Sequence, residues 1–260
     1  MVTRCGFGCG EWGGGLAGIA ARAGRARLAA AAAALLCCAL AGVPGASHAR
    51  SAASDSVRHA VDESIGRVSL LNLGTHTPGG LPLQVPDEIH DNQQLLAYFK
   101  AWHPAYAPGT RRTYTNPGIG TLGWIAAQSM GQDFTALIEQ RLFPALGLTN
   151  SFIDVPPDRA ADYAQGYTKD GKPIRLVGGV LGPEAYGVKA SAADMLRFIE
   201  ANMKLVDVAA PLQRAIIDTH TGYFKSGPIT QDLIWEQYPY PVALNTLLAG
   251  NGPAMLSDAM

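Results

Sequence analysis

The chain has 260 residues, a formal net charge of −1 and a globular composition, with 48% hydrophobic and 16% charged residues. This length suits one large domain or two small ones, each able to bury a core. Nucleic acid is excluded as a partner class, because phosphate binding needs a surplus of Lys and Arg that this chain lacks.

The first fifty residues have the layout of a secretory signal peptide. Arginines precede an apolar run from Leu28 to Val43, and small residues follow it at Ser47-His48-Ala49. We therefore expect residues 1–49 to be removed and the mature protein to be periplasmic, with no membrane attachment after cleavage. An uncleaved membrane anchor is the alternative, although this alanine-rich run is short for a spanning helix.

The cysteines agree with export. All four of them, Cys5, Cys9, Cys37 and Cys38, lie in the leader. The mature part is therefore expected to have no disulfide and no cysteine-based metal site, and we predict neither a metal nor another cofactor. A lipoprotein anchor at Cys37 is disfavoured, because Leu36 precedes it where a small residue is usual.

Apolar spacing then predicts helices joined by loops. A stripe of Leu and aromatic residues predicts a helix over 92–103, and a second apolar helix is expected over 118–130. Asp133 suits the cap of a third helix, which Pro144 and Gly147 are expected to end.

The second half of the chain begins with a loop-rich stretch over 151–190. Ser191-Ala192-Ala193-Asp194 resembles a capping box that starts a helix, and Pro211 suits the first turn of another helix, which reaches His220. The last forty residues, which hold Trp235 and several Tyr and Pro residues, are expected to begin a sheet.

Tyr114-Thr115-Asn116 is the segment that carries chemistry. A hydrolase that works through a covalent intermediate needs an activated nucleophile, a proton-transfer group and donors for the oxyanion. A tyrosine near cationic lysines can take a proton, and an asparagine two residues later can hold a substrate carbonyl in the same cleft. Alone, the pattern is weak, and the simpler interpretation is a tyrosine packed under a turn.

The surroundings of this segment resemble the class C (AmpC-type) serine β-lactamases. The resemblance covers about 68–250 and rests on Leu70 to Pro86, on Tyr114 to Gly120 thirty residues after Gln84, on Arg141 to Leu148 and on Glu184 to Ser191. It implies an α/β (α+β) fold of the β-lactamase/transpeptidase type.

The resemblance also implies roles for matching residues. Tyr114 would transfer the proton in acylation and deacylation, and Asn116 would bind the amide carbonyl of the β-lactam side chain. Gln84 and Tyr186 would line the same cleft, with ordinary loop packing as the alternative interpretation for each. The implied partner is a small-molecule β-lactam, a penicillin or a cephalosporin, and no specific protein partner is implied.

The nucleophile of this family lies in a Ser-x-x-Lys motif, which this chain lacks. None of its six lysines follows a serine by three residues. Residues 50–67 look like a remnant of the first mature helix joined directly to much later sequence. We therefore expect an internal deletion, with a helical domain over 68–220 and only a partial start of the sheet domain over 221–260.

A Lys-Ser-Gly string at Lys225-Ser226-Gly227 matches the third motif of the family, but we interpret it as a decoy. Its flanks resemble a different family stretch, and Pro228 disfavours a central strand. The true motif would lie beyond Met260, so the C-terminus looks truncated. A helical region without its sheet would expose apolar surface, which predicts poor solubility or association.

Three functions stay open on the sequence. The first is a β-lactam hydrolase of the class C family that is catalytically defective in this form. The second is a non-catalytic module that binds β-lactams or cell-wall peptides. The third is a related serine esterase or D-amino-acid peptidase. Whichever of the three holds, the nucleophilic serine is missing from this chain.

Overall fold

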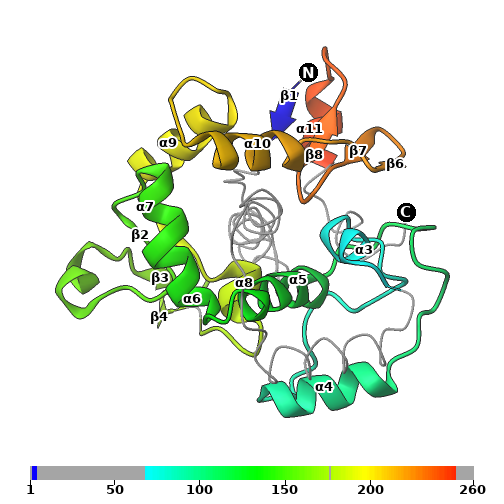
Figure 1. Cartoon of the computed structure of the whole chain (residues 1–260). Coiled ribbons are helices and arrows are strands. Elements are labelled where there is room, and N and C mark those ends of the chain that lie inside the picture. The colour runs from blue at the N-terminus through cyan, green and yellow to red at the C-terminus, as the bar shows by residue number, and fades with distance from the viewer. Residues whose placement is uncertain (1, 5–67, 176, 250–260) are drawn as a thin grey trace.

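A computed structural model describes residues 2–4, 68–175 and 177–249. Apart from Val2–Arg4, the predicted leader and the junction over 50–67 lie outside the described residues. The helices that the structure describes are α3 (Leu70–Gly74), α4 (Asn92–Ala101), α5 (Asn116–Ser129), α6 (Phe134–Leu137), α7 (Phe143–Leu146), α8 (Gly182–Tyr186), α9 (Ala192–Asn202), α10 (Ala210–Thr219) and α11 (Leu244–Ala249) (Figure 1). In residues 2–4, 68–175 and 177–249, no helix has the length and apolar character needed to cross a membrane.

The strands are short, and all of their pairings are antiparallel. A four-stranded sheet has the order β1 (Val2–Arg4), β8 (Glu236–Tyr238), β7 (Ile229–Gln231) and β6 (Phe224–Ser226). Two separate pairs are formed by β2 (Ser151–Phe152) with β5 (Lys189–Ala190) and by β3 (Gly166–Tyr167) with β4 (Pro173–Ile174). The expectation that the last forty residues begin a sheet is confirmed.

Side-chain caps explain where several helices begin. An oxygen of the residue before the helix accepts an amide hydrogen bond from its first turn at Ser69, Asp91, Thr115, Asp133 and Ser191. Such caps satisfy amides that have no partner within the helix. The starts predicted at Asp133 and Ser191 are confirmed, and α4 and α5 lie within two residues of their predicted bounds.

The prediction that Pro144 ends the third helix is wrong. Residues Ile138–Leu142 form a π-helical turn, and α7 continues through Pro144 to a left-handed Gly147 at φ 73°. Pro144 lies in the first turn of α7, where a missing amide hydrogen costs little. The wider π turn therefore lets the helical path pass the proline, and only the glycine stops it.

Helix α5 occupies the centre of the helical region, packed against α3, α6 and α8 (Figure 1). Glycine allows the closest of these approaches, because a Cβ placed on Gly120 would lie 2.6 Å from the Cβ of Leu181. Most of α5 is buried as a result. The N-terminus of this buried helix is where the candidate site lies.

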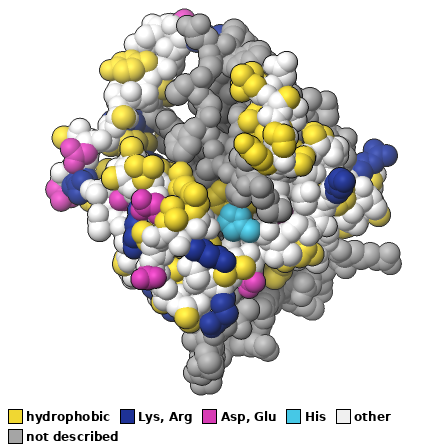
Figure 2. Space-filling model, turned by 90° about the horizontal axis from the view of Figure 1, so that it is seen from above, with side chains coloured by type: hydrophobic (Ala, Val, Ile, Leu, Met, Phe, Trp, Pro, Cys, Tyr) yellow, Lys and Arg dark blue, Asp and Glu magenta, His cyan; other side chains and the backbone are white. Residues whose placement is uncertain are grey.

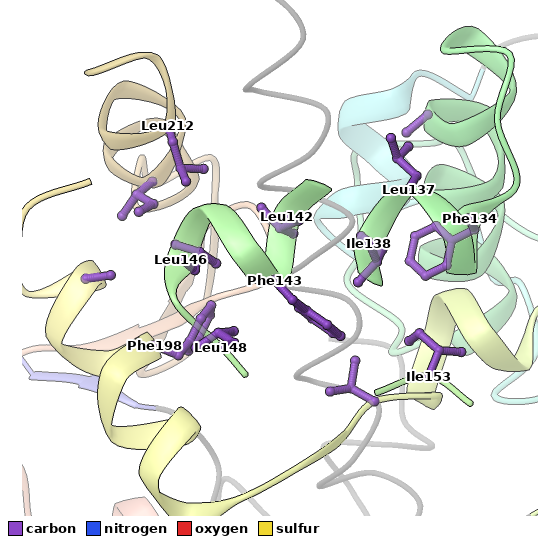
Figure 3. Close-up of a cluster of buried hydrophobic side chains, with 14 of the residues drawn as sticks. Phe134, Leu137, Ile138, Leu142, Phe143, Leu146, Leu148, Ile153, Phe198 and Leu212 are labelled. Carbon is purple, nitrogen blue, oxygen red and sulfur yellow. The ribbon is translucent and has the colours of Figure 1, made fainter. Parts of the chain in front are cut away.

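Two apolar cores flank α5. One joins the α6–α7 segment to α9 and α10 through side chains that include Phe134, Phe143, Leu146 and Phe198 (Figure 3). The other joins α3, α4 and α5 through Leu73, Leu95, Phe99 and Leu122. Both cores contact the C-terminal half of α5, and Ile119, nearer the start of the helix, packs with Ile234 in a smaller cluster.

Helix α9 ends in a motif that glycine should improve. Lys204 is exposed at φ 58°, its amide donates to the carbonyl of Ala201, and the amide of Leu205 donates to that of Glu200. Because only glycine adopts this conformation without cost, Lys204→Gly is expected to raise the free energy of unfolding by about 1 kcal/mol. The measurement is the urea midpoint at unchanged m-value. Lys204→Ala removes the same charge but keeps Cβ, so a gain of equal size in both variants would contradict the conformational explanation.

Hydrophobic side chains gather on the face seen from above, on which α9, α10 and α11 lie (Figure 2). The exposed large ones on these helices and the turns after them are Leu196, Met203, Leu205, Ile217, Leu244 and Leu248. Patches of this kind favour association. The predicted tendency of the chain to associate stays a prediction.

Candidate active site

The Tyr114 segment leads directly into α5. Thr115 is the N-cap residue, with an extended φ of −145°, and its side chain accepts a hydrogen bond from the amide of Gly118. Pro117 follows in the first turn, where proline is tolerated. Asn116 therefore opens the helix, and Tyr114 precedes it. Both side chains are buried, at 4% and 3% exposure.

The Gln84 segment lies beside this helix start. The amide of Asn116 donates a hydrogen bond to the carbonyl oxygen of Leu83 at 3.1 Å, so the two segments touch through their backbones. Gln84, the next residue, is half-buried. The structure thus brings together three of the four predicted site residues, although thirty residues separate Gln84 from Tyr114.

Two buried side chains that the sequence did not single out also border Tyr114. The His76 imidazole lies against the phenol, with ring centroids 4.3 Å apart. The guanidinium carbon of Arg112 lies 6.0 Å from the centroid of the same ring. The sequence placed Arg112 two residues from Tyr114, but gave no sign of what it pairs with.

Arg112 ties the Tyr114 segment to the sheet. It is fully buried, and its Nε donates to Oε1 of Gln231 on β7 at 2.7 Å. One terminal nitrogen forms an ion pair with Oε1 of Glu236 on β8, also at 2.7 Å. Charge-assisted hydrogen bonds of this length are the strong ones, so the pair anchors the loop before α5.

Tyr186 ends α8 and lines a cavity of about 410 Å³ beside the β2–β5 pair, with polar lining residues that include Asn150, Arg159 and Lys189. None of the other three predicted site residues is among the described residues that line this cavity. Tyr186 is half-buried. Its role in the same cleft as Tyr114 therefore stays a prediction.

The cations of this cavity already have partners. Lys189 donates from Nζ to the carbonyl oxygen of Ile153. Arg159 donates to Asp162 at 3.1 Å and to the side-chain oxygen of Asn150 at 2.7 Å. Arg159 is therefore ion-paired with Asp162, whereas Lys189 keeps its positive charge and is held by a neutral carbonyl.

Lys225-Ser226-Gly227 lies at a hairpin. Residues Phe224–Ser226 form β6, Gly227 turns the chain at φ 53°, and β7 follows from Ile229. The Lys225 side chain is exposed. The glycine of the string is used for the turn, so this glycine is accounted for by local structure.

A buried carboxyl group, that of Glu184, lies two residues before Tyr186 in α8. Burial raises the pKa of Glu184 to about 7; a backbone hydrogen bond partly lowers it, and the nearby Asp133 raises it by a smaller amount. The folded state holds the proton more tightly than the unfolded chain, whose value is 4.5. The stability that this group contributes is therefore fully present below about pH 4 and is lost as the pH rises through 7.

Glu184→Gln should remove this loss. The variant is expected to gain about 2 kcal/mol in free energy of unfolding over the parent at pH 8, and little at pH 4.5. Urea titrations at the two pH values measure the difference. Asp158→Asn, at an exposed acid, is the matched control. Equal gains of Glu184→Gln at both pH values would contradict the assignment.

No group of three or more His, Cys, Asp or Glu side chains is placed to hold a metal ion within residues 2–4, 68–175 and 177–249. The side chains of the described site are a phenol, amides and charged groups. The phenol of Tyr114 can move a proton, and the amides of Asn116 and Gln84 can bind a carbonyl.

Comparison with known proteins decides the family. A β-lactamase family model matches residues 29–256. The chain belongs to the β-lactamase family. A curated β-lactamase of Pseudomonas fluorescens is 49% identical over 196 residues, which are 75% of this chain and 55% of that protein. One of Lysobacter lactamgenus is 50% identical over 193 residues, 74% of this chain and 50% of that protein. The chain thus spans about half the length of these relatives.

Solved structures agree with this assignment. A crystal structure of a D-alanine carboxypeptidase AmpC from Burkholderia cenocepacia shares 52% identity and a TM-score of 0.77, over 90% of this chain and 64% of that one. A class C β-lactamase in complex with cefoxitin shares 44% identity and a TM-score of 0.78, over 90% and 64%. The class C family and the β-lactamase/transpeptidase-like α/β fold expected from the sequence are confirmed. The division into a helical domain and a partial sheet domain stays a prediction.

Proposed function

We propose that this chain belongs to the lineage that hydrolyses β-lactams through an acyl-serine, and that in its present form it keeps the binding and proton-transfer side of the site without the nucleophile. The observation that carries the proposal is the contrast between two motifs. Tyr114 and Asn116 stand ordered at the start of α5 beside the Gln84 segment, while no lysine of the chain belongs to a Ser-x-x-Lys motif.

In this proposal each residue keeps the role that its chemistry allows. The Asn116 and Gln84 amides hold the carbonyl of the substrate side chain, and the Tyr114 phenol stands ready to take a proton. Arg112, held by Glu236, packs beside that phenol and helps to keep it in place. Without a serine activated in a Ser-x-x-Lys motif, no acyl-enzyme forms, and a bound β-lactam leaves unchanged.

The substrate class follows from the relatives. A class C neighbour was solved with cefoxitin, so a cephalosporin is the ligand to test first. We place the protein in the periplasm, where β-lactams and cell-wall peptides are met, on the basis of the leader sequence. An internal deletion upstream of Val68 is our explanation for the missing motif.

A second candidate substrate is a D-alanyl-D-alanine peptide. Two solved neighbours carry D-alanine carboxypeptidase in their names, from Burkholderia cenocepacia and from Pseudomonas syringae. Both substrates present an amide beside a carboxylate, so one site can take either. A competition titration gives the relative affinity of the cephalosporin and the dipeptide for this site, and so separates the two candidates.

Intact-mass spectrometry and calorimetry test the proposal. After incubation with a cephalosporin, the mass of the chain is expected to stay unchanged, because no serine is acylated. Calorimetry is expected to show binding that saturates at one site. In Asn116→Ala the affinity is expected to weaken by about tenfold, because one buried hydrogen bond is lost. Asn92→Ala, at an exposed amide, is the control. A covalent adduct, or an affinity that Asn116→Ala does not change, would overturn the proposal.

A further inference from the structure

His76 contacts three consecutive residues of the segment that carries Tyr114. Its Nδ1 accepts a hydrogen bond from the amide of Thr115 at 3.2 Å, and its carbonyl oxygen accepts one from the amide of Thr113 at 2.8 Å. Between these contacts, the imidazole lies against the Tyr114 phenol, with ring planes tilted by 31°. His76 is 2% exposed. It therefore fixes the backbone on both sides of Tyr114 and touches the ring between them.

The bond from Thr115 defines the state of the imidazole. An amide can only donate, so Nδ1 must offer its lone pair, and the proton of the neutral ring is on Nε2. Thr115 is fully buried and caps α5 with its own side chain. Its backbone amide comes before the helix, so a neighbouring group has to accept from it. His76 supplies that acceptor from a different part of the chain.

The turn that presents His76 is held by its own polar contacts. The hydroxyl groups of Thr75 and Thr77 lie 2.9 Å apart, and both are buried. The side-chain amide of Asn72 donates to Thr77 at 3.1 Å, and the Thr75 hydroxyl donates to the carbonyl of Leu71 at 2.8 Å. His76 itself adopts the left-handed region at φ 57°. A side chain on such a fixed turn can hold a neighbour in one geometry.

We infer that His76 is a positioning residue for Tyr114. The neutral imidazole of His76 holds the phenol and the first turn of α5 in a fixed relative position. The inference rests on the proposed role of Tyr114 in proton transfer. Two properties test it without any reaction: which imidazole nitrogen of His76 carries the proton, and how well the loop that carries Tyr114 is ordered. Failure of cephalosporin binding alone would overturn the proposed function and leave this inference standing.

Two variants separate the acceptor from the ring. His76→Asn places Oδ1 near the position of Nδ1 and tolerates the left-handed backbone, but it removes the ring. His76→Phe keeps a ring and removes the acceptor. Hydrogen exchange of the Thr115 amide is expected to stay near the parent rate in His76→Asn and to rise by about tenfold or more in His76→Phe.

The phenol gives the second readout. With ¹³C at the tyrosine Cζ, the Tyr114 signal is expected to shift in both variants, because each one changes what lies against the ring or fixes its backbone. Equal Thr115 exchange in His76→Phe and the parent, together with an unmoved Tyr114 signal, would overturn the inference. So would failure of His76→Asn to preserve Thr115 protection in a folded chain.

A measurement on the unchanged chain covers the case in which a variant does not fold. Long-range ¹H–¹⁵N spectra of histidine distinguish the two neutral tautomers. The proton of His76 is expected on Nε2, with Nδ1 as the unprotonated nitrogen. A proton on Nδ1 at neutral pH would overturn the inference without any substitution, because Nδ1 could then not accept from Thr115.

Discussion

The purified chain is expected to hydrolyse a chromogenic cephalosporin no faster than buffer alone does. The reaction of this family needs a serine whose proton is taken inside the site, and no lysine of the 260 residues belongs to a Ser-x-x-Lys motif. In serine hydrolases, loss of the nucleophile costs about six orders of magnitude in kcat, and binding groups alone retain little. On this prediction, Tyr114 has no serine proton to take.

The assay needs two comparisons. A full-length class C β-lactamase, measured in parallel, sets the scale of full activity, and replacing its matching tyrosine by Phe should slow it. In this chain, Tyr114→Phe is expected to change nothing, because there is no turnover to lose. Turnover well above the buffer rate that Tyr114→Phe abolishes would contradict the prediction, since it would show a working nucleophile that the motif does not describe.

Arg112→Met is expected to cost about 3–5 kcal/mol in free energy of unfolding. The guanidinium is fully buried and ion-paired with Glu236, which is itself only 7% exposed. Methionine fills much of the same volume but leaves the carboxylate facing an apolar group in a buried place. A loss of this size is a large part of the stability of an ordinary domain, so the midpoint of urea unfolding should fall sharply.

A double replacement separates charge from packing. In Arg112→Met with Glu236→Gln, no buried charge is left unpaired, so at least half of the lost stability should return. Arg111→Met, at the exposed neighbour, is the matched control and should cost below about 1 kcal/mol. If the double variant were as unstable as the sum of its single replacements, the loss would come from packing and not from charge.

Local sequence predicted much of the helical region, because caps and apolar spacing act over a few residues. Asp133 and Ser191 begin helices as expected, and the start of α5 follows from Thr115 and Pro117. Pro144 failed as a stop signal, because a π turn before it accommodates the proline. That wider turn depends on packing in the surrounding core, which no short pattern encodes.

The site was only partly predictable for a related reason. The Gln84 and Tyr114 segments were paired through their resemblance to a family, and the contact of Asn116 with Leu83 agrees. Arg112 and Glu236 are 124 residues apart, and His76 precedes the Tyr114 segment by almost forty. Such partners meet only in the folded chain, so neither charge nor spacing pointed to them.

The burial of Tyr114 has a consequence for how this sequence would change over generations. At 3% exposure, with His76 against its ring and Arg112 nearby, the tyrosine is part of the packing as much as of the site. Most replacements there would weaken the fold, whatever the chain does with β-lactams. Purifying selection on foldability alone would keep the signature in place, so a lineage that had lost catalysis would still display it.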